Sequence, residues 1–194
     1  IRYSISAKDN EYKSAVERGD TATAQRLVDE VAKQAGYTVK AYHGTGYDFT
    51  VFDESKQGSN YEDWGRLGKG FYFAPKEKDA QMWAEMSSGD DTRVLGVYLK
   101  DENIIDAYGP LPEDLVETIP DDWDSLTKRM ASKYTYNYIE YMQEFGHDVQ
   151  KIMREKGYAG VVAKDSEYVM FNAEDIKSAD PVTYDDKGNV IPLS

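Results

Sequence analysis

Apolar residues recur every three or four positions at the start of the chain, and this pattern predicts two short helices. Asp9 is the expected N-cap of the first helix, whose apolar face carries Tyr12, Ala15 and Val16. The second helix is expected to begin at the cap Asp20, and its apolar positions are Ala24, Leu27, Val28, Val31 and Ala35. Gly19 and Gly36 are the expected stops, because glycine commonly follows the last helical turn. We expect residues 1–36 to form a helical N-terminal appendage.

From residue 37 onward the pattern changes to short apolar or alternating runs, which predict strands. The expected strands cover residues 37–42 (running into His43), 70–74, 93–100, 158–163 and 167–172, with a hairpin over 182–193 that turns at Lys187-Gly188. The polar stretch 54–69, which includes Trp64, predicts a loop. A helix is expected after Pro75, with Ala80, Trp83 and Ala84 on its inner face.

Residues 101–150 differ from the rest of the chain. Residues 101–120 are rich in proline and acids and predict a connection with one short helix. One long helix is expected over 123–145, and another from His147 to Gly157. We therefore predict a domain over 37–194 with a helical insertion near 101–150. Because about six or seven strands are grouped with helices rather than alternating with them, the expected class is α+β.

The composition of the chain excludes several classes of protein and of binding site. The 194 residues suit one domain with an appendage, and no run approaches the ~18 apolar residues of a membrane span. The chain has no cysteine and only two histidines, so we expect no metal site. The net charge of −13 argues against non-specific binding to nucleic acid. Neither a dinucleotide-binding glycine fingerprint nor a P-loop is present.

Three windows place polar residues beside glycine at the ends of predicted strands. They are Tyr42-His43-Gly44-Thr45, the stretch GKGFYFA around Tyr72, and the stretch DSEYVMF around Glu167. Each window alone is typical of ordinary structure: a satisfied histidine, a packed aromatic strand, or a solvated carboxylate. Their order along the chain, each in a strand context, is what makes them notable.

Together the windows HGT, GKGFYFA and EYVMF resemble the His–Tyr–Glu signature of the ADP-ribosyltransferases, in the branch of the poly(ADP-ribose) polymerases and diphtheria-type toxins. The stretch KGYAGVV also resembles transferase domains within large phage and mobile-element proteins. The resemblance implies a split antiparallel sheet. We expect His43 and Tyr72 on neighbouring strands and Glu167 opposite them.

The resemblance also implies site roles, with NAD as co-substrate and no metal. His43, Tyr72 and Glu167 are the expected catalytic residues, and Glu167 would stabilise the positive charge that builds on the ribose. The residues expected to bind NAD are His43, Gly44, Thr45, Tyr72, Trp83 and Arg66. Tyr72 and Trp83 would hold the nicotinamide ring, and Arg66 the pyrophosphate. Ala80 departs from the family pattern, which often has a small hydroxyl residue there.

Several alternatives stay open. The acceptor is expected to be a protein rather than nucleic acid, but water as acceptor would make the chain an NAD glycohydrolase. A non-catalytic interaction domain with a transferase-like fold is the alternative from another class. We expect a cytoplasmic protein, or one that is delivered into a host or target cell, and we expect no membrane partner. The chain could be part of a larger polypeptide, and the resemblance implies a toxin-like character.

Overall fold

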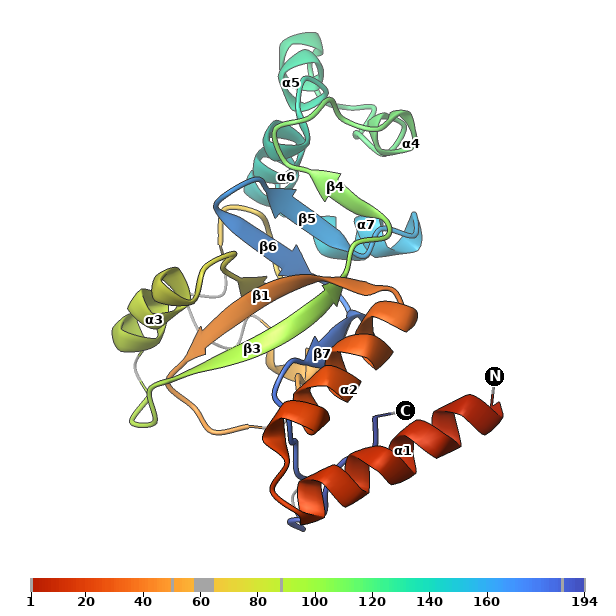
Figure 1. The fold of residues 1–194 in the computed structure, drawn as a ribbon. Coiled ribbons are helices and arrows are strands. Elements are labelled where there is room, and N and C mark those ends of the chain that lie inside the picture. The colour runs from red at the N-terminus through yellow and green to blue at the C-terminus, as the bar shows by residue number, and fades with distance from the viewer. Residues whose placement is uncertain (1, 50, 58–64, 88, 186, 194) are drawn as a thin grey trace. The chain divides into compact units, whose positions relative to one another are not determined.

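The computed structural model describes residues 2–49, 51–57, 65–87, 89–185 and 187–193 (Figure 1). Contacts within the chain divide it into two units. The first unit contains residues 1–52, 76–101 and 176–194, and the second contains residues 53–75 and 102–175. The boundary expected at residue 36 stays a prediction.

The first unit is built on a three-stranded antiparallel sheet in the order β1-β3-β7 (Figure 1). The strands are β1 (Tyr37–Thr45), β3 (Arg93–Lys100) and β7 (Ile176–Ser178). The helices are α1 (Arg2–Glu17), α2 (Thr21–Gln34) and α3 (Glu77–Met86). β1 pairs with β3 from Tyr37 opposite Lys100 to Thr45 opposite Arg93, so β1 ends in the His-Gly-Thr window, as predicted.

The two N-terminal helices form as predicted, except at the first cap. Asp20 caps α2 by accepting a hydrogen bond from the Thr23 amide at 3.1 Å. Gly19 and Gly36 follow the two helices with positive φ angles of 69° and 86°. Asp9 lies inside α1, which begins at Arg2, and its carboxylate accepts a hydrogen bond from the Leu193 amide instead. The cap prediction for Asp9 was therefore wrong, because a contact from the distant end of the chain uses that side chain.

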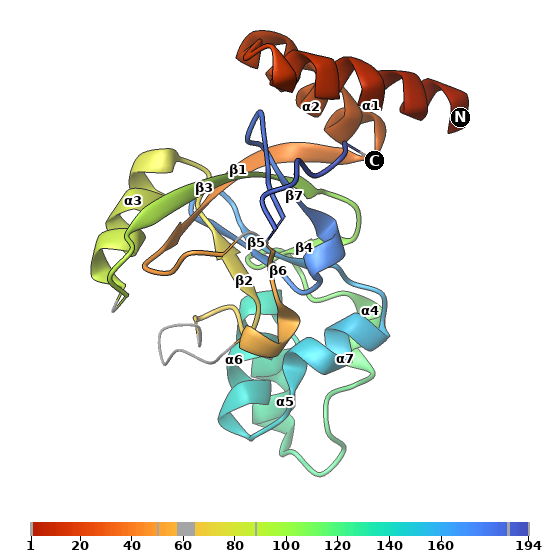
Figure 2. The ribbon, with the colours of Figure 1, turned by 90° about the horizontal axis from the view of Figure 1, so that it is seen from below.

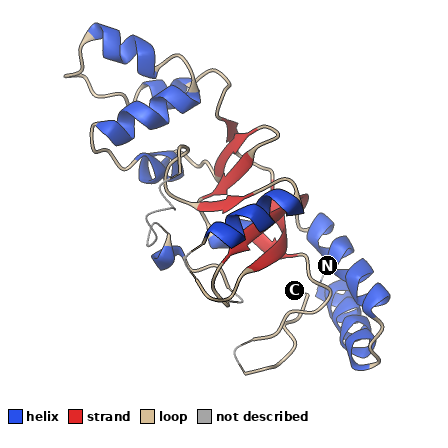
Figure 3. Ribbon diagram, turned by 90° about the vertical axis from the view of Figure 1, so that its left-hand side faces the viewer, coloured by secondary structure: helices blue, strands red, loops and turns tan. Residues whose placement is uncertain are grey.

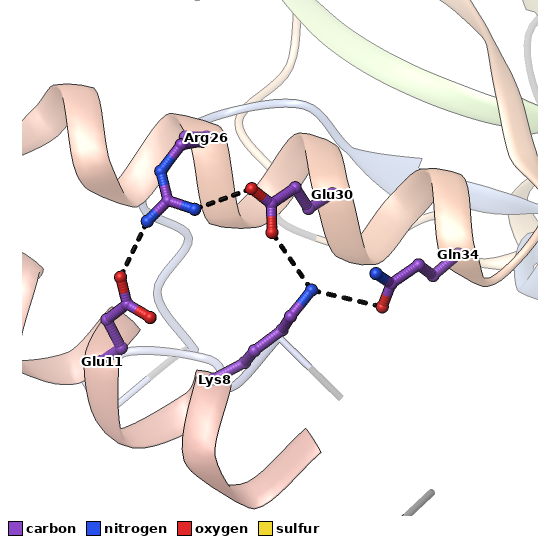
Figure 4. A network of polar contacts seen from close by, with 5 residues as sticks. All are labelled: Lys8, Glu11, Arg26, Glu30 and Gln34. Atoms are coloured by element: carbon purple, nitrogen blue, oxygen red, sulfur yellow. Dashed lines mark hydrogen bonds and ion pairs between the residues drawn. The ribbon is translucent and has the colours of Figure 1, made fainter. Parts of the chain in front are cut away.

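Both apolar packing and ion pairs join α1 to α2. The buried residues of this cluster are Tyr12, Ala15, Ala24, Leu27, Val28 and Leu193. On the surface, Arg26 pairs with Glu11 and Glu30, each at 2.7 Å, and Lys8 pairs with Glu30 at 3.1 Å (Figure 4). Because these charged side chains are partly or fully accessible to solvent, which screens the ion pairs, the apolar cluster contributes more to stability than the ion pairs.

The second unit contains a four-stranded sheet in the order β2-β6-β5-β4. The strands are β2 (Phe71–Phe73), β4 (Ile104–Asp106), β5 (Gly160–Ala163) and β6 (Glu167–Met170). All neighbours are antiparallel except β4 and β5, which are parallel. The helices are α4 (Glu113–Val116), α5 (Ser125–Ala131), α6 (Thr135–Glu144) and α7 (Val149–Glu155), with 3-10 turns at Glu54–Lys56 and Ala173–Asp175.

Helices α4 to α7 gather beside this sheet (Figure 2). Leu115, Tyr138, Ile139, Met142, Val149 and Met153 from these helices share one core with Val161 and Val169 of the sheet. The described strands thus lie in two sheets, and along the chain the helices follow one another in groups rather than alternating with single strands (Figure 3). This arrangement is the α+β class that the sequence predicts, and it is consistent with a split sheet.

The long helix predicted over residues 123–145 is two helices. α5 begins after its cap Asp124, and Tyr134 is extended, with φ −140° and ψ 154°. The break allows the amides of Thr135 and Tyr136 to donate to the carbonyls of Gly109 and Ala107, at 3.2 and 2.7 Å. Apolar spacing continues through residues 132–134, so the sequence pattern contains no sign of this tertiary pairing.

Short strands were also missed. β4 and β7 have three residues each, too few to show a period of two. In the described residues, the hairpin expected over residues 182–193 contains an antiparallel bridge between Tyr184 and Val190, and the amides of Asp185 and Ile191 donate across it to the carbonyls of Asn189 and Thr183. α7 begins at Val149 with Asp148 as its cap, so His147 precedes that helix. Among the described helices, none combines the length and the apolar character needed to cross a bilayer.

Candidate functional site

The predicted site residues fall into two groups, one in each unit. His43, Gly44, Thr45 and Trp83 belong to the first unit, and Arg66, Tyr72 and Glu167 belong to the second. The expectation that His43 and Tyr72 lie on neighbouring strands was wrong. His43 pairs with Leu95 on β3, whereas the strand that carries Tyr72 pairs with the strand that carries Glu167. Strand pairing is set by long-range contacts, so the order of motifs along the chain did not reveal it.

The His43 ring is held edge-on by two phenylalanines of the segment after β1. The ring centroid of His43 lies 5.8 Å from that of Phe49 and 5.2 Å from that of Phe52, and the two phenylalanines are themselves 5.1 Å apart. Edge-to-face contacts at these distances restrict how an imidazole can turn. Phe49 and Phe52 were not predicted as site residues, although two aromatics three residues apart just after the His-Gly-Thr window were a signal for them.

Gly44 packs directly on helix α3. A Cβ atom at this position would lie 1.9 Å from the Ala80 carbonyl oxygen and 2.8 Å from the Ala84 amide nitrogen. These atoms belong to the helix backbone, and Ala80 and Ala84 are fully buried, so the contact leaves no room for a Cβ atom at position 44. β1 is the edge strand of the described sheet, and edge strands keep backbone groups that sheet pairing does not use. Next to it, the buried Thr45 accepts a hydrogen bond from the Tyr47 amide at 3.1 Å.

Trp83 is 56% exposed, whereas Ala80 and Ala84 on the same helix are buried. The prediction that all three share the inner face of the helix is therefore wrong for Trp83. The two alanines are four residues apart and point to β1, and the tryptophan is displaced around the helix from that line. An indole that is more than half exposed is available to a planar ligand.

The second group is arranged by strand register. Tyr72 lies opposite Val169, and Glu167 precedes Val169 by two residues, so Tyr72 and Glu167 project from the same face of the sheet. Ala163, which is buried, lies opposite Glu167 on β5. Only 22% of the Glu167 side chain is exposed, and this burial raises the pKa of its carboxyl. Arg66 opposes that shift, with its Nη2 atom 4.0 Å from Oε1 of Glu167.

Part of the predicted loop over 54–69 is an ordered turn at residues 65–68. The Tyr72 hydroxyl donates a hydrogen bond to the Gly68 carbonyl, and a Cβ atom on Gly65 would lie 2.3 Å from the tyrosine ring. The turn therefore rests on Tyr72. Trp64, which was also predicted to lie in this loop, is outside the described residues.

The two groups offer complementary chemistry. A half-buried carboxylate beside an arginine can stabilise a positive charge that develops on a substrate. The exposed indole of Trp83 can stack on a planar ring, and the half-buried Tyr72 offers a second aromatic ring. Within the described part of the chain, no three His, Asp or Glu side chains gather as a metal site.

One comparison with known proteins gives a match. A family described as "ADP-ribosyltransferase in polyvalent proteins" matches residues 33–184, a range that contains every predicted site residue. No curated protein and no solved structure matches the chain.

Proposed function

The chain belongs to the ADP-ribosyltransferases of polyvalent proteins, and on this basis we propose that it transfers ADP-ribose from NAD to an acceptor and releases nicotinamide. The observation that carries the proposal is the placement of Glu167. Its half-buried carboxylate shares a sheet face with Tyr72 and lies 4.0 Å from Arg66. Such a carboxylate is what the transferase reaction needs.

The reaction breaks the bond between nicotinamide and its ribose. The electron pair leaves with nicotinamide, and positive charge develops on the ribose as an oxocarbenium-like state. A carboxylate already fixed beside that ribose stabilises the charge without reorganising as the bond breaks. Glu167 would fill this role and hold the ribose 2′-hydroxyl. The acceptor then forms the new bond to the ribose carbon and loses its proton.

The other residues would bind and orient NAD. His43, held by two phenylalanine rings, would donate or accept a hydrogen bond at the adenosine-side ribose. Gly44 on the edge strand would present its backbone hydrogen-bonding groups to the nicotinamide amide. Thr45 would fix the backbone that follows through the hydrogen bond that its side chain accepts. Tyr72 and Trp83 would each contribute an aromatic ring to nicotinamide binding. Arg66 would interact with the pyrophosphate, since its side chain is 67% exposed.

The acceptor and the wider context are part of the proposal. A chain with a net charge of −13 favours a protein acceptor over nucleic acid, because phosphate backbones are repelled. The family description refers to polyvalent proteins, and we take this chain to be a transferase domain of a larger polypeptide of phage or mobile-element type. Residues 1–36 would be its helical appendage, since the family match begins at residue 33.

The test is incubation of the protein with NAD labelled in the ADP-ribose part, together with a cell lysate. Label on protein supports transfer to a protein acceptor. Label on nucleic acid contradicts the acceptor proposed here, and free ADP-ribose alone indicates an NAD glycohydrolase. Glu167→Gln should lower nicotinamide release by about 10²–10³-fold while NAD still binds. If the unchanged protein releases no nicotinamide, the chain is a non-catalytic interaction domain.

A further inference from the structure

Three interactions hold the turn at residues 65–68 in place. The Gly68 amide donates to the Gly65 carbonyl at 3.1 Å, which closes the turn, and Gly68 takes a positive φ of 91°. Leu67 is 2% exposed and belongs to the core of the second unit. With Leu67 turned into the core, Arg66 remains at the surface of the turn.

Tyr72 is the third point of attachment. Its hydroxyl donates to the Gly68 carbonyl, so the far end of the side chain is bonded to the turn. Gly65 lies against the same end of the ring, where any Cβ atom would be 2.3 Å from Cζ and from the hydroxyl oxygen. A residue larger than glycine at position 65 would force the turn and the ring apart.

Arg66 is thereby placed beside Glu167. Of the charged side chains that the structure describes, it is the cation that pairs with this carboxylate, at 4.0 Å. The neighbouring cation Lys164 is engaged with Asp106 at 3.1 Å. Among the described residues, the titratable or charged groups near Glu167 are Arg66, which pairs with it from the turn, Tyr72, which is near it by strand register on β2, and Lys164 and Asp165 in the connection between β5 and β6.

We propose that Tyr72 anchors the Gly65–Gly68 turn, and that this turn holds Arg66 as a positioning residue for the Glu167 carboxylate. This inference rests on the proposed function, because the charge of Glu167 affects the reaction only if an ionised carboxylate stabilises an oxocarbenium-like state. Burial of Glu167 favours its neutral form, and the guanidinium favours the charged form. Tyr72 thus acts on the reaction through the turn, in addition to any contact with nicotinamide.

The experiment measures the pKa of Glu167 directly, by a carboxyl-carbon NMR titration assigned with Glu167→Gln. Removing the cation in Arg66→Gln should raise this pKa by about half a pH unit, a size typical of an exposed ion pair. Arg66→Lys should restore most of the difference, because it keeps the charge. Arg129→Gln makes the same change of net charge at an exposed position of α5, and should leave the Glu167 pKa unchanged.

Tyr72→Phe tests the anchor, because it removes the hydroxyl and keeps the ring. It should raise the Glu167 pKa in the same direction as Arg66→Gln, and should add nothing in the Arg66→Gln background. An unchanged Glu167 pKa in Arg66→Gln overturns the role of Arg66, and an unchanged pKa in Tyr72→Phe, or additive effects of the two variants, overturns the anchor. These readouts do not depend on turnover. A chain that releases no nicotinamide but gives the expected titrations would refute only the proposed function.

Discussion

Tyr72 and Glu167 extend from the same face of one sheet, on neighbouring antiparallel strands. Tyr72 lies opposite Val169, and Glu167 is two residues before Val169 on the same strand. The separation of diagonal neighbours in such a pair is about 7–8 Å between Cα atoms, within reach of long side chains. The face they share is apolar, with Ala163 and Val169 buried on it. Ionising a carboxylate at the edge of an apolar face costs free energy, and this cost should be measurable in the stability of the protein.

Glu167→Gln should stabilise the protein near neutral pH. Burial raises the folded-state pKa of Glu167 above its ordinary value of 4.5. The stabilising effect of the bound proton is fully present below the unfolded pKa and is lost as the pH rises through the folded pKa. At pH 7 the native chain therefore carries a buried charge that glutamine avoids. We expect the variant to melt about 1–3 °C higher at pH 7.

The gap should narrow as the pH falls through the folded pKa, and it should close below the ordinary value of 4.5, where the carboxyl is protonated in both the folded and the unfolded chain. Thermal melts at several pH values provide the measurement. Glu140→Gln on α6 is the control, since it makes the same change of net charge at an exposed position. A Glu167→Gln variant that is less stable at pH 7 would show that the charged form is favoured in the fold.

Trp83→Ala should weaken nicotinamide binding more than it weakens the fold. The indole is 56% exposed, so its removal should cost at most about 1–1.5 kcal/mol of unfolding free energy, rather than the ~3–5 kcal/mol of a core tryptophan. Loss of a stacking partner should lower nicotinamide affinity by roughly two- to twelve-fold. Trp83→Phe should retain part of that affinity.

Calorimetry with nicotinamide and thermal melts of both variants check this prediction. Met82→Ala is the matched control, because Met82 is a 50% exposed apolar residue on the same helix. Equal affinity in Trp83→Ala, Met82→Ala and the native chain would remove Trp83 from the proposed NAD-binding residues.

Gly44→Ala should destabilise the first unit by about 1–3 kcal/mol, a range typical of overpacking. The added Cβ atom would meet the backbone of α3 at Ala80, and a helix backbone cannot turn aside as a side chain can. Gly96→Ala on the neighbouring strand is the control, since the nearest atom there is the Ala179 Cβ at 3.8 Å, an ordinary contact. Urea unfolding of the two variants gives the comparison. Equal losses would show that contact with α3 is not what requires glycine at position 44.

Local features of the chain were predictable because their physics lies within a few neighbouring residues. The Asp20 cap, the stops at Gly19 and Gly36, and the full length of β3 follow from side chains and periods read in short windows. The three motif windows likewise carried the family resemblance, which the match over residues 33–184 confirms. These features need no knowledge of what packs against them.

Other features arise from contacts between residues far apart in the chain. The pairing of β2 with β6 brings Tyr72 onto the face of Glu167, although 94 residues lie between them in the sequence. The break before α6 is stabilised by the carbonyls of Ala107 and Gly109, and the turn at residues 65–68 is fixed in part by Leu67, which is buried in the core of the second unit. Such partners satisfy backbone groups and fill space only once the chain has folded, so a periodic pattern of apolar residues cannot encode them.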